Sequence, residues 1–220
     1  MLIALSSCKK EVEEPQPIEQ SVTYPIGNYP SGFGSSQGTP VCSPFVLPSN
    51  IVYIGEIFSH SFKVTNFNKE TDNIDDFITT PKSNFIVLGS GSLVNVYIKF
   101  FNTRPQQSIL IIPAGLVFSC IDTTAQTGII VQPDTVIIPG NDTIGINLKC
   151  YCTNLHKHVP SNTNFKLSGI TLHKDFNTLI GILKNKKKLS QGSQLQSIIW
   201  HITDAGGLTD ADITYLNNLP

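Results

Sequence analysis

The chain has 220 residues, of which 40% are hydrophobic and only 14% are charged, and its formal net charge is −1. Ordinary soluble domains carry about 25% charged residues. Here neutral polar and β-branched residues take up the difference, which favours an exported β-protein over a helical cytosolic enzyme. The hydrophobic content excludes global disorder. The near-zero charge argues against a nucleic-acid binder, and no apolar run reaches the roughly 18 residues of a membrane-spanning helix.

Residues 1–8 form a short apolar run that ends in small residues and a cysteine. The sequence Leu5-Ser6-Ser7-Cys8 resembles the lipobox of a bacterial lipoprotein signal peptide, and the missing basic region predicts that the chain starts inside the signal. The charged run that follows, residues 9–14, resembles the export tag of surface lipoproteins of Bacteroidota. This resemblance implies fatty acids such as palmitate on Cys8 and a position on the outer membrane, exposed at the cell surface.

Residues 9–44 have the composition of a tether. Glutamate gives way to proline, glycine and serine, and few large apolar residues are present. Such a composition cannot bury enough surface to offset the entropy of ordering. We therefore predict a flexible spacer between the lipid anchor and the folded domain.

Residues 45–172 show the period of two that is typical of β-strands. In residues 93–100 one face consists of Val94, Val96, Ile98 and Phe100, and in residues 143–152 one face consists of Ile144, Ile146, Leu148, Cys150 and Cys152. Further strands are predicted over 51–58, 60–67, 84–88, 108–112, 115–120, 128–132, 134–138 and 165–172. This many short strands, separated by glycine and proline turns, predict a mainly β fold, an Ig-like sandwich with these faces in its core.

Residues 173–220 change to a helical period. A first helix carries Phe176, Leu179, Ile180 and Leu183 on one face, and a second, over about 193–203, carries Leu195, Ile198, Ile199 and Ile202. A third is expected to start at Thr209, with Asp212 as its capping partner. Helices this short are marginal alone, so we expect a small helical segment packed on the sandwich.

Common catalytic motifs are absent from the sequence, including Gly-x-Ser-x-Gly, the phosphate-binding loop and His-Glu-x-x-His. His156 and His158 lack further ligands at metal-binding spacing. The sequence therefore predicts no enzymatic activity, no metal and no cofactor.

Two short blocks resemble the internal thioester domains of bacterial surface adhesins. One is Tyr151-Cys152 at a strand end, and the other is Leu195-Gln196-Ser197-Ile198-Ile199-Trp200, followed by Thr203-Asp204. The resemblance implies that the Cys152 sulfur and the Gln196 side-chain carbonyl form a thioester, which amines or hydroxyls of a host then open. It also implies that Tyr151 and Trp200 shield the bond. A thioester is an activated acyl group that must be kept from water, and Gln196 and Trp200, four residues apart, share one side of their helix.

Simpler interpretations of the same residues stay open. In an exported protein Cys152 could belong to a disulfide, because Cys42, Cys120, Cys150 and Cys152 make an even set. The spacing of Ser193 and Gln196 also fits a capping box, in which Gln196 only closes the helix start.

These observations favour a lipid-anchored surface protein that contacts the membrane through its anchor and binds a host or extracellular protein or glycan. In one interpretation it is a covalent adhesin that uses Cys152 and Gln196. In the other it is a non-catalytic, disulfide-stabilised β-sandwich with a binding or structural role.

Overall fold

The computed structural model of the chain describes residues 30–59, 85–189 and 194–220. Cys8, the strand predicted over 60–67 and Ser193 lie outside these described residues. The elements are β1 (Cys42–Ser43), β2 (Ile51–Phe58), β3 (Phe85–Gly89), β4 (Val94–Asn102), β5 (Ser108–Ile112), β6 (Leu116–Cys120), β7 (Gly128–Ile129), β8 (Asp134–Ile138), β9 (Thr143–Cys152), β10 (Phe165–Thr171), α1 (Lys174–Leu183), α2 (Leu195–Asp204) and α3 (Asp210–Asn217). The prediction of a mainly β fold with a helical C-terminal segment is confirmed.

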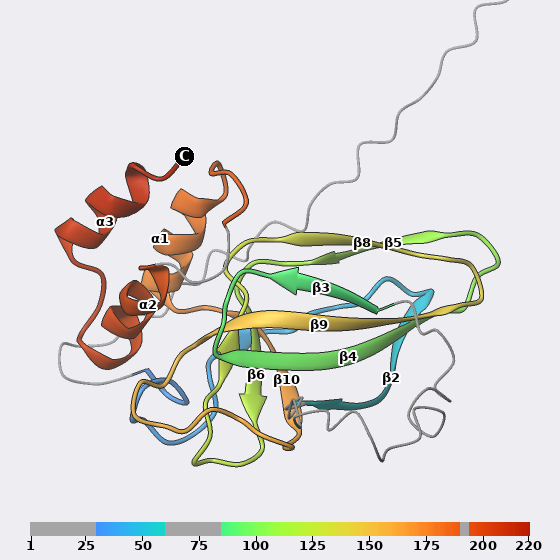
Figure 1. Ribbon diagram of the computed structural model, residues 1–220, viewed down its shortest axis with the longest axis horizontal. Coiled ribbons are helices and arrows are strands. Elements are labelled where there is room, and N and C mark those ends of the chain that lie inside the picture. Colours follow the sequence, from blue (N-terminus) through green and yellow to red (C-terminus); the bar gives the residue numbers. More distant parts are fainter. Residues whose placement is uncertain (1–29, 60–84, 190–193) are drawn as a thin grey trace, which may run out of the picture.

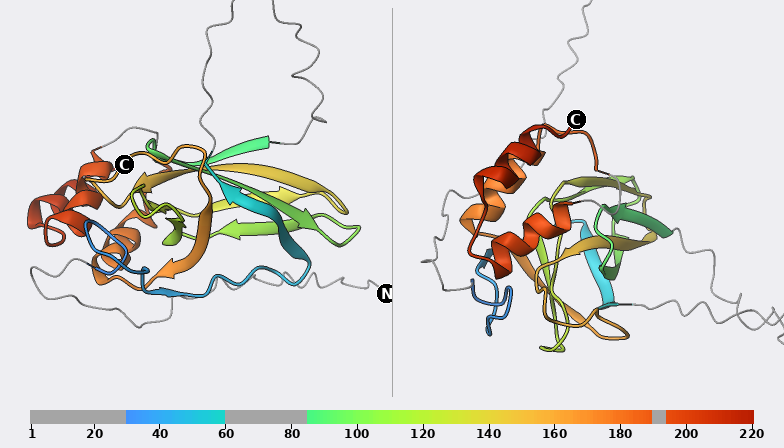
Figure 2. Two further views of the ribbon diagram at one scale, coloured as in Figure 1. Left: turned by 90° about the horizontal axis from the view of Figure 1, so that it is seen from below. Right: turned by 60° about the vertical axis from the view of Figure 1, so that its left-hand side comes forward.

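Eight strands form one sheet in the order β1-β10-β6-β7-β9-β4-β2, with β3 added parallel to β9. The sheet curls, as Figures 1 and 2 show, and a bridge between Phe58 and Asn164 connects the end of β2 to the segment before β10. The predicted division into two facing sheets is not confirmed, because β9 pairs with β4 along most of its length and with β7 at its end. Strand β9 therefore connects β4 and β2 on one side to β7, β6, β10 and β1 on the other within a single sheet.

The core prediction is confirmed along β4 and β9. These antiparallel strands place apolar residues directly opposite one another, as in the pairs Val96–Leu148 and Ile98–Ile146. The predicted core residues are all buried inside the curled sheet: Val94, Val96, Ile98, Phe100, Ile144, Ile146 and Leu148. The alternation of apolar and polar residues decides which face turns inward, because successive side chains of a strand point to opposite sides.

The three helices gather at one end of the sheet (Figure 2). Their apolar faces, including Leu179 of α1 and Ile199 of α2, build a second core cluster between the helices and the sheet. The predicted helix faces are confirmed, as is the capping box between Thr209 and Asp212 at the start of α3. Helix α2 begins at Leu195 with Gln194 as its N-cap, whose side chain makes no capping hydrogen bond.

The folded part begins earlier than the predicted tether boundary at residue 44. Phe33 is 1% exposed and packs edge-on against Phe176 of α1, and β1 pairs with β10. Glycines in the left-handed region, such as Gly32 and Gly34, allow the tight turns that bring Phe33 into the helical core. The predicted tether is therefore wrong for residues 30–44, where one large aromatic side chain anchors a segment of otherwise loop-like composition.

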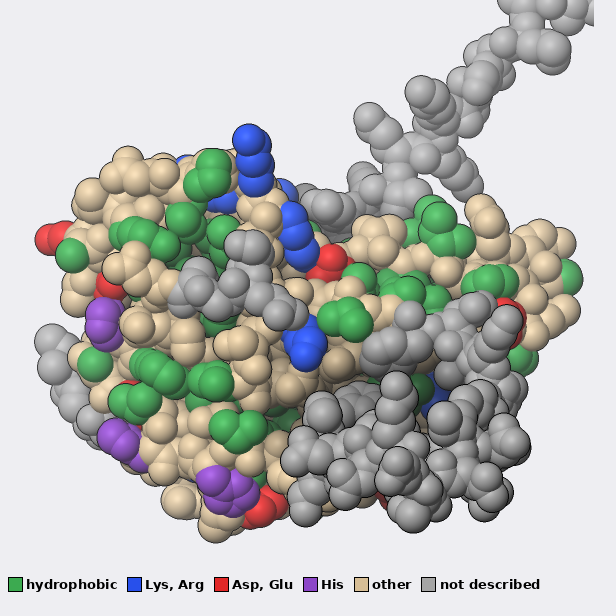
Figure 3. Space-filling model, in the orientation of Figure 1, with side chains coloured by type: hydrophobic (Ala, Val, Ile, Leu, Met, Phe, Trp, Pro, Cys, Tyr) green, Lys and Arg blue, Asp and Glu red, His purple; other side chains and the backbone are tan. Residues whose placement is uncertain are grey.

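Strands β5 and β8 form a separate two-stranded sheet. Its inward side chains, such as Leu110 and Val136, are buried, whereas the directly paired Ile109 and Ile137 are 58% and 57% exposed. Figure 3 shows apolar side chains on the surface over these strands. The two-stranded sheet β5–β8 therefore presents an apolar face to the surface.

Candidate functional site

The end of β9 and the start of α2 meet through Gln196. The Cys152 backbone N–H donates to Gln196 Oε1 at 3.0 Å, and Gln196 Nε2 donates to the Cys152 carbonyl at 2.8 Å. Strand β4 begins at Val94, which pairs with Cys150, so the Cys152 backbone lies beyond the end of that neighbour. The Gln196 amide takes the place of the missing strand and satisfies both backbone groups, which would otherwise be buried without partners.

The Cys152 sulfur is enclosed and receives two hydrogen bonds. Cys152 is 0% exposed. The indole N–H of Trp200 donates to Sγ at 3.5 Å and the Asn154 N–H at 3.3 Å, and the Asn154 carbonyl lies 3.3 Å from Sγ as acceptor for the thiol. The structure thus brings together Cys152, Gln196 and Trp200, as the two sequence blocks predict.

The chemistry of the free thiol follows from its burial. Burial raises the pKa of the Cys152 thiol to about 11, although the hydrogen bonds from Asn154 and Trp200 lower it in part. At neutral pH the sulfur is therefore a neutral thiol, and it lacks the thiolate that nucleophilic cysteine enzymes use. The enclosure also keeps water from the sulfur, which is the condition under which an activated acyl group survives.

Tyr151 does not shield the sulfur, contrary to the sequence-based expectation. Its side chain belongs to the helical core cluster, whereas Cys152 belongs to the cluster inside the sheet. Its hydroxyl donates to Ser90 Oγ at 3.1 Å. Adjacent residues of a strand point to opposite faces, so the aromatic ring before the cysteine lies on the other side of β9.

Helix α2 contacts the end of β9 and the turn after it with side chains at one-turn intervals. Gln196 holds the Cys152 backbone, Trp200 touches the sulfur, and Asp204 Oδ2 accepts from the Leu155 N–H at 3.2 Å. Residues four apart lie above one another on a helix. The spacing of Gln196, Trp200 and Asp204 was visible in the sequence, but the role of Asp204 required knowing where Leu155 lies.

Asp204 has one satisfied and one unsatisfied oxygen. Its Oδ2 also accepts from the Thr203 hydroxyl at 2.6 Å. Its Oδ1 is buried without a hydrogen-bond partner among the described residues. The carboxylate therefore anchors the turn after β9 through one oxygen only.

The N-terminal loop closes over the same turn. The Gly34 N–H donates to the Thr153 carbonyl at 2.8 Å, and Asn154 Nδ2 donates to the Gly34 carbonyl at 2.8 Å. Thr153 and Asn154 are both 0% exposed. Gly34 has φ +57°, and a Cβ there would lie 2.1 Å from the Thr203 carbonyl oxygen. Only glycine allows this close approach, which adds a second layer to the enclosure of Cys152.

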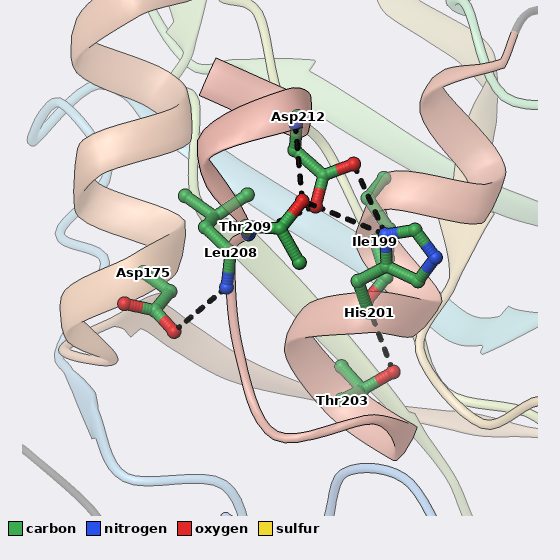
Figure 4. A network of polar contacts seen from close by, with 7 residues as sticks. All are labelled: Asp175, Ile199, His201, Thr203, Leu208, Thr209 and Asp212. Carbon is green, nitrogen blue, oxygen red and sulfur yellow. Dashed lines mark hydrogen bonds and ion pairs between the residues drawn. The ribbon is translucent and has the colours of Figure 1, made fainter. Parts of the chain in front are cut away.

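His201 faces away from this site. Its Nδ1 lies 3.0 Å from both carboxylate oxygens of Asp212. Figure 4 shows this contact between α2 and α3, together with the hydrogen bond from the Leu208 N–H to Asp175 of α1. Its offset of five residues from Gln196, about 140° around the helix, places His201 on another side of α2.

The structure forms none of the disulfides considered among Cys42, Cys120, Cys150 and Cys152, because all four of these described cysteines are free thiols. Cys42 pairs with Thr171 of β10 and Cys120 with Phe165. These partners lie six positions apart on one strand (171 − 165), a separation of about 20 Å. A disulfide needs Cα atoms within about 7 Å.

The pairing of β7 also keeps Cys120 from β9. Phe118 of β6 and Cys152 of β9 pair with the same residue of β7, Gly128. One strand therefore lies between them, which puts β6 and β9 about 9.6 Å apart. Cys150 points into the cluster inside the sheet, whereas Cys42 packs against the helical cluster.

Comparison with known proteins returns no matching family model, curated protein or solved structure. Within the described residues, no helix has the length and apolarity needed to cross a membrane. In the same part of the chain, no group of three His, Cys, Asp or Glu residues could hold a metal ion. His158 instead binds the Thr124 hydroxyl at 2.8 Å and lies 3.5 Å from Asp122.

Proposed function

We propose that this chain is a lipid-anchored protein of the bacterial outer membrane that attaches covalently to surface nucleophiles through an internal thioester. The bond joins Cys152 Sγ to the side-chain carbonyl carbon of Gln196. One observation carries the proposal: the Gln196 amide is paired with the backbone of the cysteine it would acylate, while Trp200 contacts the sulfur of that cysteine. The anchor, Cys8 within its lipobox, comes from the sequence alone.

Formation of the thioester needs no reactant beyond the side chains of Cys152 and Gln196. The Cys152 sulfur attacks the Gln196 carbonyl carbon, the carbon–nitrogen bond breaks, and the amide nitrogen leaves as ammonia with the thiol proton. Negative charge develops on Gln196 Oε1, which already accepts from the Cys152 N–H at 3.0 Å. A fixed N–H donor at the oxygen that becomes charged is the usual means of stabilising such an intermediate.

Burial explains how the product survives in water. The sulfur lies in a fully buried residue, beneath Trp200 on one side and the turn at Asn154 on the other. An amine of a protein or a hydroxyl of a glycan opens the bond by attacking the same carbon, which leaves the nucleophile linked to Gln196 and frees the Cys152 thiol. The protein is then joined to its partner and performs no turnover.

Intact mass spectrometry of the anaerobically purified protein tests the proposal. The wild type is expected to be lighter than its sequence by one ammonia. Methylamine should add to Gln196 and release one thiol. Cys152→Ala should lose both effects, and Cys120→Ala, a half-buried cysteine at the end of β6, should keep them. A wild-type protein with the full sequence mass that is inert to methylamine would contradict the thioester.

The second candidate is a non-catalytic lipoprotein with a binding or structural role. The same double hydrogen bond favours it, because Gln196 already has a complete structural task in satisfying the Cys152 backbone. In this case the mass equals the sequence mass and all thiols titrate. We further propose that the curled sheet derives from an Ig-like sandwich whose halves are joined at β9.

A further inference from the structure

Asn154, two residues after Cys152, is buried and held by its side chain from two separate parts of the chain. Its Oδ1 accepts from the Thr127 N–H at 2.7 Å, next to β7. Its Nδ2 donates to the Gly34 carbonyl of the N-terminal loop at 2.8 Å. Its backbone N–H points at the Cys152 sulfur, 3.3 Å away. A buried side chain with this set of partners has one orientation, and it fixes the direction of its own backbone N–H.

We infer that Asn154 is a positioning residue that controls how fast the thioester opens. Its clamped side chain keeps the backbone N–H on the sulfur that must leave. This inference rests on the proposed thioester. The second donor, the Trp200 indole, approaches the same sulfur from α2, so the leaving atom receives donors from two independent elements.

The opening step shows why these donors matter. A primary alkylammonium loses a proton, and the free amine attacks the Gln196 carbonyl carbon. The carbon–sulfur bond breaks, and its electron pair stays on Cys152 Sγ. The nitrogen then loses a second proton, so that one of the two protons ends on the thiol and the other in solvent. Charge is greatest on the sulfur at bond cleavage, and hydrogen bonds to a charged atom are stronger than those to a neutral one.

The nearby charges are few. Asp204 disfavours the Cys152 thiolate, and Lys157 favours it more weakly. Neither makes a hydrogen bond to the sulfur among the described contacts, whereas Asn154 and Trp200 do. The sulfur is in contact with these two N–H donors and with the Asn154 carbonyl, 3.3 Å away; the donors stabilise the developing charge, and the carbonyl accepts from the thiol once it is protonated.

The test compares the rate of methylamine addition, followed by intact mass, in the wild type and in Asn154→Ala. The thioester should still form in the variant, and its reaction with methylamine should be slower by about tenfold or more, the effect of one hydrogen bond to a charged group. A purely structural role predicts the opposite sign, because a loosened site lets water and amines in faster. Asn164→Ala, whose side chain bonds Glu56 instead, is the matched control.

A second variant keeps the inference testable if Asn154→Ala does not fold. Gly34→Ala displaces the loop that accepts from Asn154 Nδ2, because the added Cβ meets the Thr203 carbonyl oxygen. Gly34→Ala should therefore also slow methylamine addition, as Asn154→Ala does. Gly55→Ala is its control, since Gly55 also has a positive φ, +73°, but its Cβ would meet nothing within 4 Å.

The outcomes separate the two proposals. If the wild type shows no ammonia deficit, the thioester fails and the role of Asn154 with it. If the deficit is present but Asn154→Ala, or Gly34→Ala where only that variant folds, reacts as fast as the wild type or faster, the positioning role is overturned while the thioester stands.

Discussion

Gln196 and Cys152 are joined by two hydrogen bonds, although 44 residues separate them in the chain. The side-chain amide of Gln196 acts as a short strand that continues the sheet where β4 has ended. The same geometry therefore satisfies the backbone at the end of β9 and holds the Gln196 carboxamide against a buried cysteine.

Replacing Gln196 with alanine should destabilise the protein. The substitution leaves the Cys152 N–H and carbonyl without partners in a buried position, which costs about 1–3 kcal/mol. Urea unfolding followed by circular dichroism measures the loss. Gln107→Ala, on the exposed surface after β4, should change the free energy of unfolding by less than about 0.5 kcal/mol. Equal stability of the two variants would show that the double hydrogen bond contributes nothing.

Truncation of Ile146 tests the core inside the sheet. Ile146 is 0% exposed and lies opposite Ile98, so Ile146→Ala should cost about 2–5 kcal/mol by loss of burial and creation of a cavity. The matched variant Ile137→Ala removes the same atoms from a side chain that is 57% exposed, and it should cost much less. Chemical unfolding of both variants measures the difference. Equal unfolding midpoints for Ile146→Ala and Ile137→Ala would contradict the assignment of Ile146 to the core.

Asp212 should make stability depend on pH in the acid range. Burial opposes its ionisation, but hydrogen bonds from Thr209 and His201 outweigh burial and hold the pKa of Asp212 below its ordinary value. A carboxyl with a lowered folded-state pKa stabilises the fold above its unfolded pKa of about 3.9, and this contribution is lost as the pH falls through the folded value. Asp212→Asn should therefore be less stable than the wild type at pH 7.

The difference between Asp212→Asn and the wild type should shrink as the pH is lowered below about 4. Thermal unfolding at a series of pH values measures it. Asp210→Asn is the control, because Asp210 lies exposed in the same first turn of α3. If the stability difference between Asp212→Asn and the wild type stays constant down to the lowest pH at which both proteins fold, ionisation of Asp212 in the capping box is excluded as its cause.

Cys8→Ser tests the anchor in the native host. If Cys8 carries the lipids as proposed, the variant should move from the membrane fraction to the soluble fraction, because acyl chains would supply the membrane affinity. Cys42→Ser is the appropriate control, since Cys42 lies in the folded part on β1. Retention of Cys8→Ser in the membrane would mean that another segment holds the protein there.

The sequence by itself determined the local elements and their buried faces. The alternation in β4 and β9 identified the residues that now pair as Val96–Leu148 and Ile98–Ile146, and the helical spacing identified Leu179 and Ile199 as core residues. These features depend on periods of two and 3.6 residues, which short windows of sequence contain. The two blocks at Cys152 and Gln196 were identified differently, by their resemblance to thioester domains and not by a period.

Only the tertiary structure decided the order of the strands and the contacts between segments that are distant in the sequence. The curled sheet, the strand β7 between Cys120 and Cys152, and the loop at Phe33 that folds onto the helices depend on contacts between distant segments. No local period encodes strand order or the closing of a loop, because these follow from the packing of the whole core. The disulfides that the structure does not form, the tether predicted too long and the shielding role expected of Tyr151 share this origin. The same holds for the contacts of Asn154, since its partners Thr127 and Gly34 become neighbours only when β7 pairs with β9 and the N-terminal loop packs on the turn after β9.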